Sequence, residues 1–307
     1  MKPHIILSLF LIISQFSMAL FGQQRPPIID MHMHIGAPMS LPPGAPAPCL
    51  PQPCIRQGHA SASSADNLKR TLEAMDRYNI VKGFLSDLDR GELSEWVKAA
   101  PDRFIISPFI LDPSKAASPD DLRKELKAKS LAGIGEIGAQ LVGIAPNDPR
   151  LEPYFALAEE FDVPVLIHTE GIGPPLPSFR SVAGNPLLLE AVMVRHPKLR
   201  VFVENSGFPY IDEMLAMMYQ YPQLYGDLST MTWIIPRSAF HDYLQRLIKA
   251  GLGKRLMFGS DQMLWPEMIG QGIEAIEEAD FLTNEQKRDI LYNNAVRFLQ
   301  LEKMSQR

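Results

Sequence analysis

The chain has 307 residues, of which 46% are hydrophobic, 21% charged and 8% aromatic. This composition is that of a globular protein rather than a disordered chain, a collagen or a coiled coil, and the length suffices for one large α/β domain or two small ones. The net charge of −5 leaves no basic excess for binding nucleic acid. Two cysteines are too few for a disulfide-rich scaffold or a four-cysteine zinc site.

The N-terminus has the pattern of a secretory signal peptide. Lys2 precedes an apolar run over residues 5–13, and small residues follow at Ser17 and Ala19. The run is shorter than the ~20 residues that span a bilayer. We therefore expect residues 1–22 to be cleaved near 19–22, which leaves residues 23–307 as a secreted or periplasmic protein that is not held in a membrane.

A long loop is expected over residues 36–63, which are rich in Pro, Gly, Ala and Ser and show no periodicity. Cys49 and Cys54 lie in this loop, and export would allow them to form a disulfide; two free thiols are the alternative. Arg56 and His59 also lie here and could belong to a lid.

The rest of the chain alternates between short apolar runs and segments with helical spacing. The apolar runs predict strands at 27–32, 81–85, 104–110, 131–137, 163–168, 199–203, 223–228 and 255–258. Helices are predicted at 66–78, 92–100, 119–129, 151–161, 186–195, 209–220, 238–250, 267–279 and 284–300. Strict alternation implies a parallel sheet, and eight such units fit a single (β/α)8 TIM barrel. The alternative, an open doubly wound sheet, is disfavoured because no Gly-rich phosphate fingerprint follows a strand.

In such a barrel the catalytic residues lie at the C-terminal ends of the strands. The first strand ends in a His-x-His pair, His32 and His34. Side chains two positions apart on a strand point the same way, so the two imidazoles should face the barrel mouth together, with Asp30 on the same face. Two imidazoles placed in this way can share a metal ion.

Other strand ends add polar side chains. Glu136, His168 and Asp261 each follow an apolar run, and a buried carboxylate needs a metal ion or a histidine beside it to offset its desolvation. Alternatives remain open, since His168 could be an ordinary core histidine and Glu136 a helix cap or part of an ion pair. Nitrogen and oxygen donors without thiolate suit zinc, and also manganese, iron or nickel.

These segments resemble the amidohydrolase superfamily, in particular its amidohydrolase-related (amidohydrolase 2) branch, which contains hydrolases and zinc decarboxylases. The resemblance is carried by residues 29–34, 135–138, 167–170, 258–262 and 294–299. It implies a metal-dependent enzyme on a (β/α)8 barrel, with one or two divalent ions and zinc as the first candidate. The metal ligands that it implies are His32, His34, His168 and Asp261, with Glu136 as the bridging carboxylate of members with two metals.

One position departs from the family pattern, which places a further histidine at the end of the sixth strand. Alternation puts Val203 and Asn205 on one face of this strand and Glu204 on the other, so Asn205 is expected at the ligand position. Because an amide oxygen is a weaker zinc ligand than imidazole, we expect one tightly held ion and a weak or differently built second site.

The remaining expectations concern chemistry and substrate. Asp261 could act as the general base and then as the general acid, and Asp30 could orient a metal-bound imidazole. Arg180 could bind a substrate carboxylate, unless it is a solvated loop residue, and Trp233 and Trp265 could form a wall of the pocket.

The sequence therefore predicts an exported metal-dependent hydrolase that cleaves a C–O or C–N bond of a small ester, lactone or amide. A zinc-dependent decarboxylase on the same scaffold and a non-catalytic exported binding protein are the alternatives. We expect no nucleic-acid partner, and an oligomer is left open.

Overall fold

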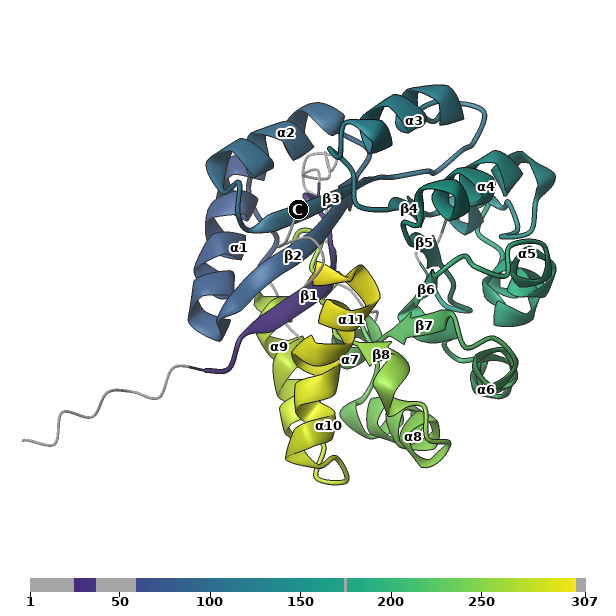
Figure 1. The fold of residues 1–307 in the computed structure, drawn as a ribbon. Helices are drawn as coiled ribbons and strands as arrows, with labels where there is room; N and C mark the ends of the chain where they lie inside the picture. Colours follow the sequence, from purple (N-terminus) through teal and green to yellow (C-terminus); the bar gives the residue numbers. More distant parts are fainter. Residues whose placement is uncertain (1–24, 37–58, 174–175, 302–307) are drawn as a thin grey trace, which may run out of the picture.

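The computed structural model describes residues 25–36, 59–173 and 176–301. Within these ranges eight parallel strands alternate with helices, and the helices surround the strands (Figure 1). The predicted (β/α)8 barrel is confirmed. The predicted signal peptide, Cys49, Cys54 and Arg56 lie outside the described residues, so the expectations for them stay predictions.

The strands form two parallel sheets that join into one barrel. Their bounds are β1 Ile28–Met33, β2 Ile80–Asp87, β3 Phe104–Pro108, β4 Ile134–Ile137, β5 Val165–His168, β6 Val201–Glu204, β7 Leu224–Asp227 and β8 Leu256–Met257. The sheet orders are β1-β2-β3 and β4-β5-β6-β7-β8. Beyond β3, the Ile110 N–H donates to the carbonyl oxygen of Glu136 at 2.7 Å, and at the other seam the Met31 N–H donates to the carbonyl oxygen of Phe258 at 2.9 Å. These two bonds close the ring.

The described helices are α1 Ser64–Tyr78, α2 Arg90–Ala99, α3 Pro119–Lys127, α4 Glu152–Phe161, α5 Glu190–Arg195, α6 Ile211–Gln220, α7 Met231–Ile234, α8 Arg237–Lys249, α9 Glu267–Glu277, α10 Asn284–Arg288 and α11 Asn294–Leu299. Among them, α1, α2, α3 and α10 begin at a side-chain cap. The Ser63 side chain accepts the Asp66 N–H at the start of α1. Ser118 caps α3 in the same way, with Pro119 at its first position as the sequence predicts.

The last predicted helix, 284–300, is interrupted. A π turn, Asp289–Asn293, separates α10 from α11. In this turn the carbonyl oxygen of Ile290 accepts the N–H of Phe258, 2.9 Å away, just beyond β8. The helix widens into a π turn at the point where its backbone is hydrogen-bonded to the barrel. The hydrophobic periodicity of the segment does not predict this turn. The short helix α7 was not predicted either.

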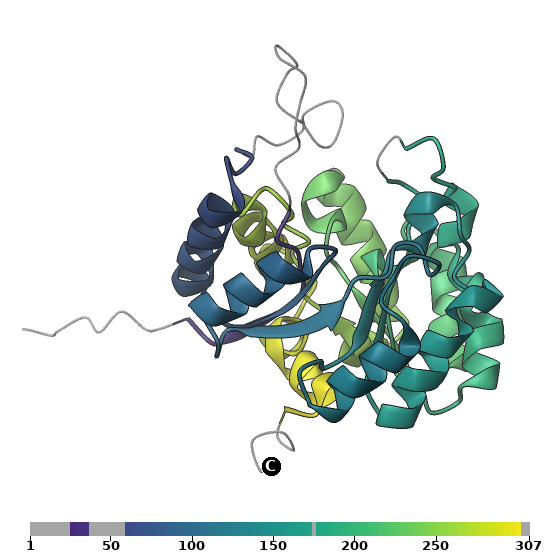
Figure 2. The same cartoon turned by 90° about the horizontal axis from the view of Figure 1, so that it is seen from above.

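Both faces of the strands are buried. Residues that alternate along each strand pack either inside the barrel, as Phe202 does, or between the strands and the helices, as Val201 and Val203 do. The C-terminal helix α11 closes the end at which β6 and β7 begin, with the Phe298 ring 5.7 Å from that of Phe202 and 4.7 Å from that of Tyr225. Figure 2 shows the strands in the middle and this yellow segment near one end.

The carboxyl ends of the strands therefore gather at the end of the barrel opposite α11, which is where the predicted site residues lie. Among the described residues, no helix is both long enough and apolar enough to cross a lipid bilayer.

Candidate metal centre

The two histidines at the end of β1 face each other, as predicted. Their Nε2 atoms are 3.1 Å apart, and both side chains are buried. Each Nδ1 is held from behind: that of His34 lies 2.8 Å from the carbonyl oxygen of Ser86, and that of His32 lies 2.8 Å from Asp227 Oδ2. Because a carbonyl only accepts, the proton of a neutral His34 is on Nδ1, and its Nε2 presents a lone pair to the centre.

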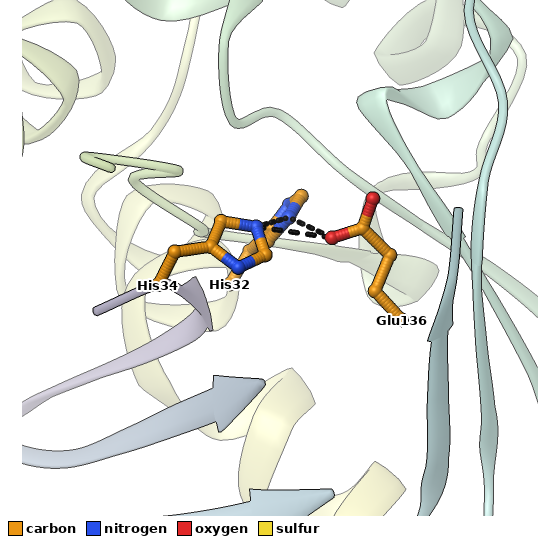
Figure 3. Close-up of side chains that lie close together, drawn as sticks. All are labelled: His32, His34 and Glu136. Atoms are coloured by element: carbon orange, nitrogen blue, oxygen red, sulfur yellow. Dashed lines mark hydrogen bonds and ion pairs between the residues drawn. The ribbon is translucent and has the colours of Figure 1, made fainter. Parts of the chain in front are cut away.

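Glu136, from the end of β4, reaches the same point. Its Oε2 is 3.0 Å from His34 Nε2 and 3.4 Å from His32 Nε2. One ligand atom from each of His32, His34 and Glu136 lies within 4.8 Å of the other two. Figure 3 shows the three side chains pointing toward one another. This arrangement matches a metal site of two imidazoles and a carboxylate.

Asp261, which follows β8, lies beside the pair. Its N–H donates to the carbonyl oxygen of His32 at 2.8 Å, in a left-handed backbone conformation with φ 47°. Its Oδ1 is 3.3 Å from His34 Nε2 and has no hydrogen-bond partner although it is buried. The structure thus brings this carboxylate, which the sequence analysis expects at the centre, next to the histidine pair.

His168, at the end of β5, approaches Glu136 from the other side. Its Nδ1 is 2.9 Å from Glu136 Oε1, and its Nε2 is 3.4 Å from Glu170 Oε1. Glu136 therefore lies between the β1 histidines and His168, one oxygen toward each, which is the placement expected of a carboxylate that could bridge two ions.

The expectation for the end of the sixth strand is wrong. Glu204, not Asn205, points to the centre, with its Oε1 3.8 Å from His32 Nε2. Asn205 turns away because its backbone is left-handed, φ 59°, and its Oδ1 accepts the hydroxyls of Ser229 and Thr230, both at 2.7 Å. Alternation separates the two residues correctly, but the sequence analysis took the wrong face as the inward one because both faces of this strand are buried.

The expected role of Asp30 is also corrected. Its Oδ1 accepts the N–H of Ser260 at 2.9 Å and that of His32 at 3.2 Å, so this carboxylate braces the backbone between β1 and β8. Burial raises the pKa of Asp30 to about 7. The carboxylate that holds the His32 imidazole is Asp227, at the end of β7. The sequence analysis missed it, although asking which polar residue ends the seventh strand would have found it.

The predicted substrate residues lie outside the histidine cluster. Arg180 is exposed and donates to the carbonyl oxygens of Pro177 and Phe179 in its own loop, so the solvated-loop alternative holds for it. Trp233 is buried near Asp261: its Nε1 donates to the carbonyl oxygen of Ser260 at 2.8 Å, and its ring lies 6.3 Å from that of Trp265. The two tryptophans thus form an apolar cluster beside the centre.

The electrostatics of the centre are those of a cation site. Burial alone would lower the pKa of His34, but Glu136 and then Asp261 outweigh it and raise the pKa to about 9. Burial would raise the pKa of Glu136, but His34 and the other imidazoles hold it well below its ordinary value. Both Glu204 oxygens and Asp261 Oδ1 are buried without hydrogen-bond partners, and Glu204 Oε1 and Asp261 Oδ1 each lie 3.8 Å from His32 Nε2. The donor set and these orphaned atoms fit a divalent metal ion.

Comparison with solved structures supports the fold. A TIM-barrel protein of Bordetella bronchiseptica superposes with a TM-score of 0.67 at 19% identity, over 90% of this chain and 99% of that one. A probable 2-pyrone-4,6-dicarboxylic acid hydrolase of Acinetobacter baumannii gives 0.62 at 14%, over 89% and 99%. A 5-carboxyvanillate decarboxylase of Novosphingobium aromaticivorans, complexed with manganese, gives 0.51 at 16%, over 75% and 79%. At these identities the likeness shows the fold alone.

Sequence comparison gives a short match and a long one. Protein fluG of Emericella nidulans is 25% identical over 137 residues, which are 45% of this chain and 14% of the fluG protein. The chain thus corresponds to a small part of that relative. The family model described as Amidohydrolase (Amidohydro_2) matches residues 29–301, which include every strand of the barrel and all the residues of the candidate centre. The chain belongs to this amidohydrolase family.

Proposed function

We propose that this protein is a metal-dependent hydrolase that cleaves a C–O or C–N bond in a small ester, lactone or amide. One observation carries the proposal: the ligand atoms of His32, His34 and Glu136 converge within 4.8 Å, with Asp261 Oδ1 buried and unpartnered beside them. Carboxylate oxygens crowded this closely around buried imidazoles are costly unless a cation joins them.

The residues of the centre have different roles in the proposed hydrolysis. A divalent ion bound here would lower the pKa of a water molecule to ~7 and polarise the substrate carbonyl. Asp261 takes the proton from the attacking water and returns it to the leaving group, because its free Oδ1 faces the centre and its backbone is fixed to that of His32. Asp227 fixes the His32 ring, and the Trp233 and Trp265 cluster limits the access of water from one side.

The metal and the compartment are part of the proposal. We propose zinc first, because imidazole and carboxylate donors suit it, and manganese second, because the structurally similar decarboxylase is complexed with manganese. We also propose that the protein is exported and acts on a small molecule outside the cytoplasm. N-terminal sequencing of the protein recovered from the periplasm or medium should start near residues 20–23; an intact Met1 would contradict export.

The first test is elemental analysis of the purified protein beside a His32→Ala, His34→Ala double variant. We expect one or two equivalents of a transition metal in the native protein and almost none in the variant. His241→Ala is the matched control, because this histidine lies among the outer helices, where its Nε2 contacts the carbonyl oxygen of Ala275 and its ring lies 5.6 Å from that of Phe281.

A substrate screen then separates the reactions. Hydrolysis of esters, lactones or amides that disappears in the double variant supports the proposal. Carbon dioxide release without hydrolysis would instead identify a decarboxylase, the activity named for one structural relative. Absence of any bound metal, even after metal is added, would leave a non-catalytic binding protein.

A further inference from the structure

Glu204 is a buried carboxylate for which the fold supplies no hydrogen bond. Its exposed fraction is 1%, and neither side-chain oxygen has a hydrogen-bond partner. Its backbone, by contrast, is well held, because the carbonyl oxygen of Glu204 accepts both the N–H and the hydroxyl of Thr169. The protein thus fixes the backbone and leaves the carboxylate free toward His32 Nε2, 3.8 Å away.

The neighbouring carboxylates Asp227 and Glu136 each have close polar partners. Asp227 binds the His32 ring and accepts the backbone N–H of Asn205 at 2.5 Å, while the two oxygens of Glu136 face His34 and His168. In the described ranges, the ion pairs that Glu136, Glu204 and Asp261 form are all with histidine. Three imidazoles do not balance the four buried carboxylates of Asp227, Glu136, Glu204 and Asp261, so the group left over calls for a cation.

The side-chain oxygen of Asn205, which the sequence analysis expects as the strand-six metal ligand, already has hydrogen-bond partners. The Asn205 side-chain oxygen already accepts two hydroxyl hydrogen bonds, from Ser229 and Thr230, and these use both of its lone pairs. A metal ion at the centre could not draw on this oxygen without leaving the buried Thr230 hydroxyl unpaired, whereas the Ser229 hydroxyl can donate instead to Asp227 Oδ1 at 2.9 Å.

We infer that Glu204 takes the place of Asn205 as the strand-six donor to the metal ion that the proposed function requires. The donor set is then two imidazoles, His32 and His34, with three carboxylates, Glu136, Glu204 and Asp261. Three oxygens and two nitrogens make a five-ligand set, which an open zinc site and Mn²⁺ can both accept.

The test is metal titration of the Glu204→Gln variant. Glutamine keeps the shape but removes the charge, so calorimetric titration of the metal-free protein with Mn²⁺ and with Zn²⁺ should show affinity lowered at least ~10-fold. Glu170→Gln is the matched control: it replaces a buried carboxylate just beyond the neighbouring strand β5, beside His168, and should change the affinity less than about threefold.

Thermal unfolding separates a ligand from a structural residue. Because Gln replaces a buried carboxylate that has no hydrogen bond, metal-free Glu204→Gln should melt at or above the temperature of the metal-free native protein, while the increase on adding Mn²⁺ should shrink. A Glu204→Asp variant, which keeps the charge on a shorter side chain, should bind with intermediate affinity. A variant that melts earlier without metal and binds Mn²⁺ unchanged would assign Glu204 a purely structural role and overturn the inference.

The inference and the proposed function, on which it rests, can fail separately. Unchanged metal affinity in Glu204→Gln overturns the inference and leaves the hydrolase proposal standing. Glu204-dependent metal binding in a protein that cleaves no ester, lactone or amide supports the inference and contradicts the hydrolase. A native protein that binds no metal refutes both.

Discussion

At the scale of single residues, the His32 imidazole is the most constrained group of the centre. Its Nδ1 meets Asp227, and its Nε2 lies among Glu136, Glu204 and Asp261, at 3.4, 3.8 and 3.8 Å. Burial alone would lower the pKa of His32, but these carboxylates, Asp261 first, raise it well above its ordinary value. Carboxylates on both sides of one ring thus set its orientation and its proton affinity.

The Asp227→Asn variant tests how the ring is held. We expect the affinity for Zn²⁺ or Mn²⁺ to fall by about 10–100-fold, because an amide orients the imidazole less firmly and does not raise its basicity. Calorimetric titration of the metal-free variant measures this. Asp212→Asn is the control, since Asp212 is an exposed residue of α6 that pairs with Arg246, and its affinity should equal that of the native protein. Equal affinity in Asp227→Asn would show that the ring needs no carboxylate.

The sequence predicts some of these residues and misses others. The His32 and His34 pair follows from local geometry, because residues two apart on a strand point the same way. Asp227 is 195 residues from His32 along the chain, and no local pattern links the two. Their contact exists only because β7 lies close to β1 once the barrel closes.

At the scale of elements, the C-terminal segment contains a π turn and covers one end of the barrel. In the π turn Asp289–Asn293 the Ile290 carbonyl oxygen accepts a hydrogen bond from the backbone just beyond β8. Helix α11 follows and packs the Phe298 ring against Phe202. Arg200 donates to the carbonyl oxygen of Phe298, and its guanidinium lies 5.6 Å from the ring. This end of the barrel therefore contributes stability, while the opposite end contributes chemistry.

Phe298→Ala tests the contribution of this end to stability. Removing a phenyl ring that is 1% exposed should lower the free energy of unfolding by about 3–5 kcal/mol, which urea denaturation measures. Val194→Ala, at a residue of α5 that is 65% exposed, is the control and should change it by less than about 0.5 kcal/mol. The metal content of folded Phe298→Ala should stay native; loss of metal would mean that the two ends are coupled.

At the scale of the whole molecule, the barrel concentrates carboxylates from β4, β6, β7 and the segment after β8 at one end. Each strand brings one acidic side chain, and closure of the ring brings them within a few ångströms of His32. Their mutual repulsion costs folding free energy, which a bound cation would offset. Stability and metal binding should therefore be linked.

Removal of metal by a chelator followed by dialysis should lower the melting temperature. A ligand at 100 times its Kd contributes about 2.7 kcal/mol, which for a chain of this size corresponds to roughly 4–5 °C. Differential scanning calorimetry with and without added Zn²⁺ or Mn²⁺ measures the shift. The His32→Ala, His34→Ala protein is the control and should show no shift; a shift of equal size there would place the metal elsewhere.

The sequence by itself determined the alternation of eight strands and helices, the histidine pair of β1, and the arrival of Glu136, His168 and Asp261 at strand ends. These follow from periodicity and from short-range geometry. The tertiary structure alone decided that Glu204 faces the centre while Asn205 faces away, that Asp227 holds His32, and that Arg180 binds its own loop. The physical reason is that both faces of a barrel strand are buried, so the apolar pattern carries no information about which face points inward.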